Sequence, residues 1–238
     1  MKVILLTTFE NPWGMEMIKL INTHQNFELQ AVICSVDIER DQQHKEIIKS
    51  RTGNQYIPPS IDSIINQNEF SVPFYFTQSH NNVTTNNILK EYLPEIIVLG
   101  GADIIQEAIL KIPIKGTINV HPGLLPQYRG CSAVEWSIFN DDPVGAACHY
   151  VTTKVDSGKI IFQKEMKIHS GDLYEKIRSN IFKHAAEVLI EALNIIDKNL
   201  VFDSLEKSDS RYYKTIDSKS LAAVKEKLVA KRYKNYSK

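Results

Sequence analysis

The chain has 238 residues, a formal net charge of zero, and 43% hydrophobic and 24% charged residues. This length favours one large domain or one domain with an appendage. The balanced charge provides no global field toward nucleic acid or a membrane surface, so we expect neither as a partner. We also expect no membrane span or signal peptide, because the apolar run Val3–Leu6 is short and no cleavage site follows it. The cysteines lack metal-ligand spacing and indicate buried thiols in a reducing compartment, so we expect a cytoplasmic protein.

The first half of the chain alternates short apolar runs with segments of helical spacing. The apolar runs predict strands over 3–7, 28–34, 72–76, 95–99 and 116–120, and the intervening patterns predict helices over 15–22, 37–49, 84–92 and 104–110. Residues 50–70 are rich in Asn, Ser, Gln and Pro, which predicts an excursion with one short helix. Such an alternation predicts an α/β, Rossmann-like fold: a doubly wound, mostly parallel sheet with helices on both faces.

The second half predicts a helix over 132–140, β-rich runs over 145–152 and 159–167, and a long amphipathic helix over 172–197. We expect the two β-rich runs to pair and to extend the sheet. The last forty or so residues are short, polar and mixed. We therefore divide the chain into a domain over 1–200 and a short C-terminal appendage over 201–238.

The most informative segment is Asn119-Val-His121-Pro-Gly-Leu-Leu-Pro-Gln-Tyr-Arg-Gly130, with Val155-Asp156-Ser157-Gly158 further along the chain. Asn119 and His121 are two residues apart, so on a strand their side chains leave the same face. The Pro and Gly residues then force a loop just past the strand end. Ligands of doubly wound sheets bind outside the carboxyl ends of the strands. We therefore expect Asn119, His121 and Asp156 to converge in an active site.

Other polar features have simpler explanations. Gly100-Gly101 lacks the third glycine of a dinucleotide fingerprint. His149 lies inside an expected strand, and we interpret it as a structural histidine. Cys131 is interpreted as a small buried thiol, because no partner for thiol chemistry is evident. We expect the remaining histidines to lie at the surface: His24, His44, His80, His169 and His184.

The two quoted segments resemble the folate-dependent formyltransferase family, which includes glycinamide ribonucleotide, methionyl-tRNA and sugar N-formyltransferases. The resemblance is firm over about 95–161 and plausible over 1–200. It implies that Asn119, His121 and Asp156 are the catalytic residues and that the donor is 10-formyltetrahydrofolate, with no metal. It also implies a pterin pocket formed by two loops: Gly101, Ala102, Asp103, Ile104 and Ile105 in one, and Thr153, Lys154, Val155 and Ser157 in the other.

The chemistry suits these residue types. An amine attacks the formyl carbon, and the Asn119 amide can donate a hydrogen bond to the resulting oxyanion. His121 can move the proton from the amine toward the leaving folate nitrogen, since an imidazole titrates near neutral pH. Asp156 can orient and stabilise the imidazolium or an ordered water.

The acceptor is inferred from what surrounds the motif. After the first strand the chain carries Thr7-Thr-Phe-Glu-Asn-Pro-Trp-Gly14 instead of a Gly-Ser-rich phosphate loop, which argues against glycinamide ribonucleotide. Only 38 residues follow position 200, so we expect no nucleic-acid-binding domain. We favour a nucleotide-linked 4-amino-4,6-dideoxy sugar.

For such a sugar we expect substrate contacts from Trp13, Leu124, Tyr128 and Arg129. Arg129 or Lys154 is a candidate for the pyrophosphate, and an aromatic group is a candidate for stacking: Trp13, Tyr128, Trp136, Tyr212 and Tyr213. An amino-acid-type amine, glycinamide ribonucleotide and methionyl-tRNA stay as alternatives. A binding module without catalysis, or a formyl-folate hydrolase, is the alternative of a different class. The 172–197 helix and the 145–168 strands offer apolar surface either for a homodimer or for the core of the domain.

Overall fold

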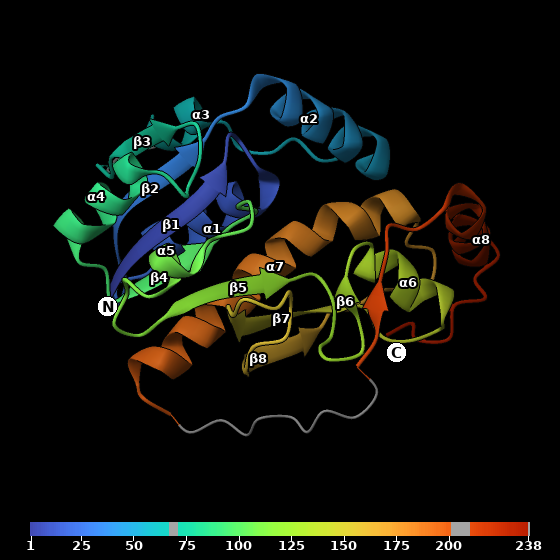
Figure 1. The fold of residues 1–238 in the computed structure, drawn as a ribbon. Coiled ribbons are helices and arrows are strands. Elements are labelled where there is room, and N and C mark those ends of the chain that lie inside the picture. The colour runs from blue at the N-terminus through green and yellow to red at the C-terminus, as the bar shows by residue number, and fades with distance from the viewer. Residues whose placement is uncertain (67–70, 201–209, 238) are drawn as a thin grey trace.

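The computed structural model describes residues 1–66, 71–200 and 210–237, and within them the core is one twisted sheet of seven strands (Figure 1). The strand order is β3-β2-β1-β4-β5-β7-β8. Strands β1 to β5 pair in parallel, whereas β7 and β8 run antiparallel to their neighbours. The strand bounds are β1 (Lys2–Thr8), β2 (Glu28–Ser35), β3 (Phe74–Thr77), β4 (Ile96–Leu99), β5 (Thr117–His121), β7 (Gly145–Tyr150) and β8 (Ile160–Glu165). The predicted doubly wound, mostly parallel sheet is confirmed.

Helices cover both faces of this sheet, because its central strands are apolar on both sides. Helices α1 (Pro12–Asn22) and α7 (Tyr174–Asp197) pack on the face that includes Val3, Leu5 and Val98. Helices α4 (Val83–Tyr92) and α5 (Glu107–Leu110) cover the face of Ile4 and Leu6. Helix α2 (Ile38–Thr52) contacts α7, and α3 (Ile61–Ile65) is the short helix expected in the excursion. The helix expected to begin at 104 begins only at Glu107, because Gln106 is its N-cap.

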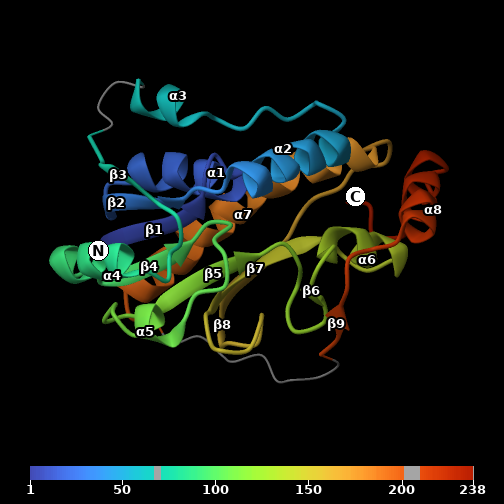
Figure 2. The same ribbon diagram turned by 45° about the horizontal axis from the view of Figure 1, so that its top comes forward.

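The C-terminal residues form ordered structure that the sequence did not reveal as such. Strand β9 (Tyr212–Tyr213) pairs in parallel with β6 (Arg129–Gly130), and α8 (Ser218–Val229) packs on α6 (Ala133–Phe139), as Figure 2 shows. Val224 and Leu228 of α8 join a core cluster with Val134 and Ile138. The expected short C-terminal appendage is therefore present, and its described residues form a small strand pair and a helix. The predicted boundary at 200 adjoins residues 201–209, which lie outside the described part of the chain.

Several single-residue expectations also fail. His80 is buried and its Nε2 contacts the carbonyl oxygens of Thr7 and Ile33, because the ends of two parallel strands leave carbonyls that need a donor. His184 is buried where α7 meets β8, and it bonds the Lys164 carbonyl. Cys131 is exposed, whereas Cys34 and Cys148 are buried. Within the described residues, no helix is both long and apolar enough to cross a membrane.

Candidate active site

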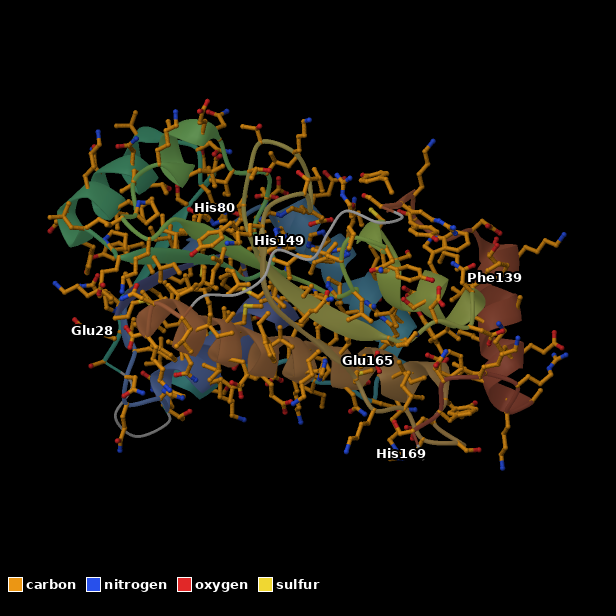
Figure 3. The ribbon with its side chains drawn as sticks, turned by 90° about the horizontal axis from the view of Figure 1, so that it is seen from below. Glu28, His80, Phe139, His149, Glu165 and His169 are labelled. Atoms are coloured by element: carbon orange, nitrogen blue, oxygen red, sulfur yellow. The ribbon has the colours of Figure 1, made fainter. Side chains whose placement is uncertain are left out.

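The site begins at the end of β5, where strand register brings three polar side chains together. Asn119 pairs with Leu99 of β4 on one side and lies directly opposite His149 of β7 on the other. Asn119 Nδ2 lies 3.4 Å from His149 Nε2. His149 is 2% exposed, and in Figure 3 it lies within the body of the molecule while the exposed His169 lies at its periphery. His149 is a buried strand histidine with polar contacts at both ring nitrogens, as expected, and it also lies beside Asn119.

Asp156 reaches the same place from the loop between β7 and β8. Its Oδ2 accepts a hydrogen bond from the Gly130 amide at 3.0 Å and lies 3.4 Å from His121 Nδ1. Its Oδ1 lies 3.6 Å from His149 Nε2. Asp156 has a φ of 47°, a left-handed conformation that an aspartate adopts more readily than most residues. The structure thus brings together the three side chains that the sequence singled out, with His149 as a fourth.

His121 is fixed by the loop that follows it. Its Nε2 donates to the Tyr128 carbonyl, and only 4% of the residue is exposed. A Cβ at Gly123 would lie 2.8 Å from Tyr128 O and 3.0 Å from His121 Nε2, so this loop closes only because Gly123 has no side chain. Burial lowers the pKa of His121, against the opposing effects of the Asp156 charge and the Tyr128 carbonyl. A neutral imidazole at neutral pH follows.

The surroundings of Asp156 favour its charged form, whereas burial favours the neutral form of His121. Burial alone would raise the pKa of Asp156, but the close contact with His149, the charge of His121 and the hydrogen bond from the Gly130 amide outweigh burial and lower the pKa to about 2. Asp156 is therefore a carboxylate at any pH at which the protein is expected to work.

His149 was missed because its role depends on strand register. Its Nδ1 lies 2.9 Å from the carbonyl oxygen of Tyr150, and since a carbonyl only accepts, Nδ1 carries the proton. In the neutral ring Nε2 is then an acceptor, and it receives the amide of Asn119. The sequence places His149 in a strand, but only the pairing Asn119↔His149 shows which residue it faces.

A cavity of about 180 Å³ adjoins Asn119, His149 and Asp156. Its walls include most of the residues expected to hold a pterin: Ala102, Asp103, Ile104, Ile105, Thr153, Lys154 and Val155. Ile104 is 83% exposed and Val155 is 50% exposed, so both present apolar surface at this cavity. Apolar side chains from two facing loops, with backbone amides and carbonyls between them, fit a flat heterocycle with a polar edge.

Three of the residues predicted to contact the pterin of the formyl donor make other contacts in the structure. Gly101 has a φ of 77° and packs against Asn11, where a Cβ would lie 2.4 Å from Asn11 Oδ1. The Asp103 carboxylate binds Arg40 at 2.7 Å and the Ser35 hydroxyl at 3.1 Å. Ser157 fastens its own loop, since its hydroxyl donates to the Lys154 carbonyl at 2.9 Å.

A second cavity, of about 520 Å³, shares Lys154 and Asp156 with the first. Arg129, Lys159, Leu125 and Pro126 also line it. The Arg129 guanidinium crosses to the Asp156 loop, where it donates to the Val155 carbonyl at 2.6 Å. Of the residues expected to contact the substrate, Arg129 is therefore the one that lines a cavity beside Asp156.

The other expected substrate contacts differ. Trp13 packs edge-on against Phe182 at 4.5 Å, in the packing between α1 and α7. The Tyr128 ring is buried and its hydroxyl donates to the Asp142 carboxylate, so this residue reaches the site through its carbonyl. Leu124 is partly buried beside Gly145. Within the described part of the chain, no group of three or more His, Cys, Asp or Glu side chains is arranged to hold a metal ion.

Comparison with known proteins agrees with this geometry. The bifunctional polymyxin resistance protein ArnA of Wigglesworthia glossinidia brevipalpis is 33% identical over 132 residues, which are 55% of this chain and 20% of that protein. The methionyl-tRNA formyltransferase of Desulforamulus reducens is 29% identical over 149 residues, which are 62% of this chain and 46% of that protein. The chain thus spans about half the length of the curated methionyl-tRNA formyltransferases that it matches, and a fifth of ArnA.

Solved structures share the fold. A sugar N-formyltransferase from Shewanella superposes with a TM-score of 0.61 at 19% identity, covering 91% of this chain and 77% of that one. A phosphoribosylglycinamide formyltransferase from Anaplasma phagocytophilum gives a TM-score of 0.62 at 17% identity, covering 91% and 99%. The model of the family described as Formyl transferase matches residues 1–193, which include Asn119, His121 and Asp156. The chain therefore belongs to the formyl transferase family.

Proposed function

We propose that this protein transfers a formyl group from 10-formyltetrahydrofolate to the primary amine of a small acceptor. The observation that carries the proposal is the convergence of Asn119, His121 and Asp156 at the carboxyl edge of the sheet, beside a cavity with exposed apolar walls. When bound, the folate donor supplies a formyl group that is already activated on nitrogen. The protein's own groups then have to orient the amine, stabilise charge and move one proton.

Asn119 is the proposed donor to the carbonyl oxygen on which negative charge develops. One amide hydrogen of Asn119 points toward His149 Nε2, which leaves the other for this oxygen. A fixed amide is more effective than a mobile one, because it needs no reorganisation during the reaction. His149 therefore acts as a positioning residue for Asn119.

His121 is the proposed proton acceptor. The neutral ring donates from Nε2 to the Tyr128 carbonyl, so its lone pair is on Nδ1, which faces Asp156 at 3.4 Å. A proton taken from the attacking amine at Nδ1 is stabilised by the adjacent carboxylate. Asp156 stays ionised, and the Gly130 amide holds it in place.

The donor's pterin is proposed to lie in the smaller cavity, between Ile104 and Ile105 on one side and Val155 on the other. Lys154 lines both cavities and marks where donor and acceptor sites adjoin. Because these contacts are apolar or use the backbone, substitution at Ile104 should affect the donor KM more than kcat.

The acceptor is proposed to be a nucleotide-linked 4-amino-4,6-dideoxy sugar. In support, the larger cavity beside Asp156 is lined by the cations Arg129, Lys154 and Lys159, which suit a diphosphate. In addition, the start of α1 is capped by the Asn11 side chain, which accepts from the Trp13 amide at 3.1 Å. In a glycine-rich phosphate loop, such a backbone amide would be free to bind the phosphate. Here the Asn11 side chain already accepts from it.

The proposal is tested by incubating the protein and 10-formyltetrahydrofolate with a panel of amines: dTDP- and GDP-linked amino sugars, glycinamide ribonucleotide and ornithine derivatives. Mass spectrometry of the acceptor should show a formamide on an amino sugar, matched by release of tetrahydrofolate. Acceptance of glycinamide ribonucleotide alone would overturn the sugar assignment. Full transfer by both Asn119→Ala and His121→Ala would overturn the assigned roles.

A further inference from the structure

The C-terminal strand β9 lies beside the site although it falls outside the family match, which ends at residue 193. The Arg129 amide donates to the Arg211 carbonyl at 3.1 Å, and the Cys131 amide donates to the Tyr213 carbonyl at 2.9 Å. We call residues 211–216 the C-terminal strap. It runs along the loop that follows His121 and joins that loop to α8.

Side chains reinforce this pairing. The Tyr213 ring stacks on Tyr128 at 5.2 Å between centroids and on Trp136 at 5.5 Å. The Tyr213 hydroxyl accepts from the Asn140 amide at 3.2 Å, and the Trp136 indole donates to the Lys214 carbonyl at 2.9 Å. Stacked aromatic pairs contribute about 0.5–1.5 kcal/mol beyond the area they bury. The strap is therefore held to the loop by both backbone and side chains.

The loop is shaped to receive the strap. Gly130 has a φ of 89°, and a Cβ there would lie 2.4 Å from the Tyr213 carbonyl oxygen and 3.0 Å from the Tyr212 ring. Any side chain at position 130 would push the two strands apart. Glycine at this position permits a close approach of two backbones, which indicates that the contact is a specific feature of the fold.

The same loop holds the two polar residues proposed to handle the proton. The Tyr128 carbonyl accepts from His121 Nε2, and the Gly130 amide donates to Asp156 Oδ2. These two backbone groups belong to residues 128 and 130. The strap accepts hydrogen bonds from the backbone amides of the residues that follow each of them, Arg129 and Cys131. A shift of the strap would therefore move the backbone of residues 128–130 and change the distance between His121 and Asp156.

We propose that the C-terminal strap, and Tyr213 in particular, is a positioning element of the formyltransferase site. It fixes the backbone of residues 128–130, and through that backbone it fixes the imidazole of His121 and the carboxylate of Asp156. This inference rests on the proposed function. It adds a role for residues 211–216, which lie beyond the segment that matches the family. Tyr213 itself touches neither substrate nor reacting atoms in this account.

The test compares Tyr213→Ala with Tyr213→Phe and with Tyr236→Ala as a matched control. Tyr236 is a tyrosine of the same C-terminal region that contacts Tyr233 and the Leu228 carbonyl. A misplacement of about 1 Å costs about 100-fold in rate, so Tyr213→Ala should lower kcat by up to about that factor with little change in either KM. Tyr213→Phe keeps the stacking ring and should keep most of kcat, as should Tyr236→Ala.

Equal loss of kcat in Tyr213→Ala and Tyr236→Ala, or no loss in Tyr213→Ala, would overturn the proposal. If Tyr213→Ala does not fold, Tyr213→Leu keeps apolar volume without a flat ring and takes its place. A readout without turnover separates this inference from the proposed function: the ¹⁵N chemical shifts of the His121 ring should differ between Tyr213→Ala and Tyr213→Phe. Absence of formamide from the unmodified protein would overturn the proposed function, while unchanged His121 shifts in Tyr213→Ala would overturn the positioning role.

Discussion

Replacement of Asp156 by asparagine removes one charge from the site while keeping the shape of the side chain. The surroundings of Asp156 lower its pKa from 3.8 to about 2. Each pKa unit corresponds to about 1.4 kcal/mol of preference for the charged form, so the site favours this carboxylate by about 2 kcal/mol. The charge of Asp156 is also the largest of the interactions that favour the protonated form of His121. An opposite charge within about 4–6 Å shifts a pKa by about 1–3 units, so if proton transfer to His121 limits the reaction, Asp156→Asn should lower kcat by about 10-fold or more.

The assay is steady-state release of tetrahydrofolate with a saturating acceptor, at several pH values. The amide of Asp156→Asn can still accept from Gly130, so folding should persist and circular dichroism should be unchanged. Because the Asp156 charge raises the pKa of His121, its loss should also move the acidic limb of the kcat profile to lower pH. A variant that retains the kcat and the pH profile of the unmodified protein would refute the proton-transfer reasoning.

The same pKa has a consequence for stability. A carboxyl group with a lowered pKa stabilises the folded state above its unfolded pKa, and this contribution disappears as pH falls. Between about pH 4 and pH 2 the unmodified protein should therefore lose about 2 kcal/mol that Asp156→Asn does not lose. Urea titrations at pH 6 and at about pH 2 measure the difference. If the free energy of unfolding falls equally in the two proteins, the fold does not lower the pKa of Asp156.

Other outcomes are expected elsewhere in the molecule. Asn119→Ala removes the amide itself, so kcat should fall by roughly 100-fold or more. His149→Phe keeps the ring volume but removes the acceptor that orients the Asn119 amide, so kcat should fall by a smaller factor. Gly14→Ala places a Cβ 2.2 Å from the Thr7 hydroxyl, so the free energy of unfolding, measured in urea, should fall by about 1–3 kcal/mol. In the native protein a disulfide reagent should modify Cys131 quickly and Cys34 slowly, because Cys34 is buried and burial raises its pKa to about 12.

The sheet was predictable because its central strands β1, β2 and β4 are largely buried and read as short, continuous apolar runs. The residues Asn119 and His121 were predictable as a pair because side chains two apart on a strand share a face. His149 was not, since only the antiparallel register of β7 against β5 places it opposite Asn119. Sequence spacing carries no information about such cross-strand neighbours.

Strand β9 and helix α8 were missed for a different reason. Two residues, Tyr212 and Tyr213, are too few to give a strand pattern, and their pairing with Arg129–Gly130 joins positions more than eighty residues apart. The helix carries Leu221, Val224 and Leu228 at helical spacing, but five lysines and arginines between 219 and 232 made the segment read as polar. Its burial comes from α6, which the sequence does not place beside it.

The most direct test of the central claim is a mass measurement on the acceptor after reaction with isotopically labelled 10-formyltetrahydrofolate. We expect the label to appear as a formamide on the amine of a nucleotide-linked amino sugar, in a one-to-one ratio with tetrahydrofolate, and to be lost in His121→Ala. Tetrahydrofolate released with free formate, and no label on any amine of the panel, would contradict the account and indicate a hydrolase instead.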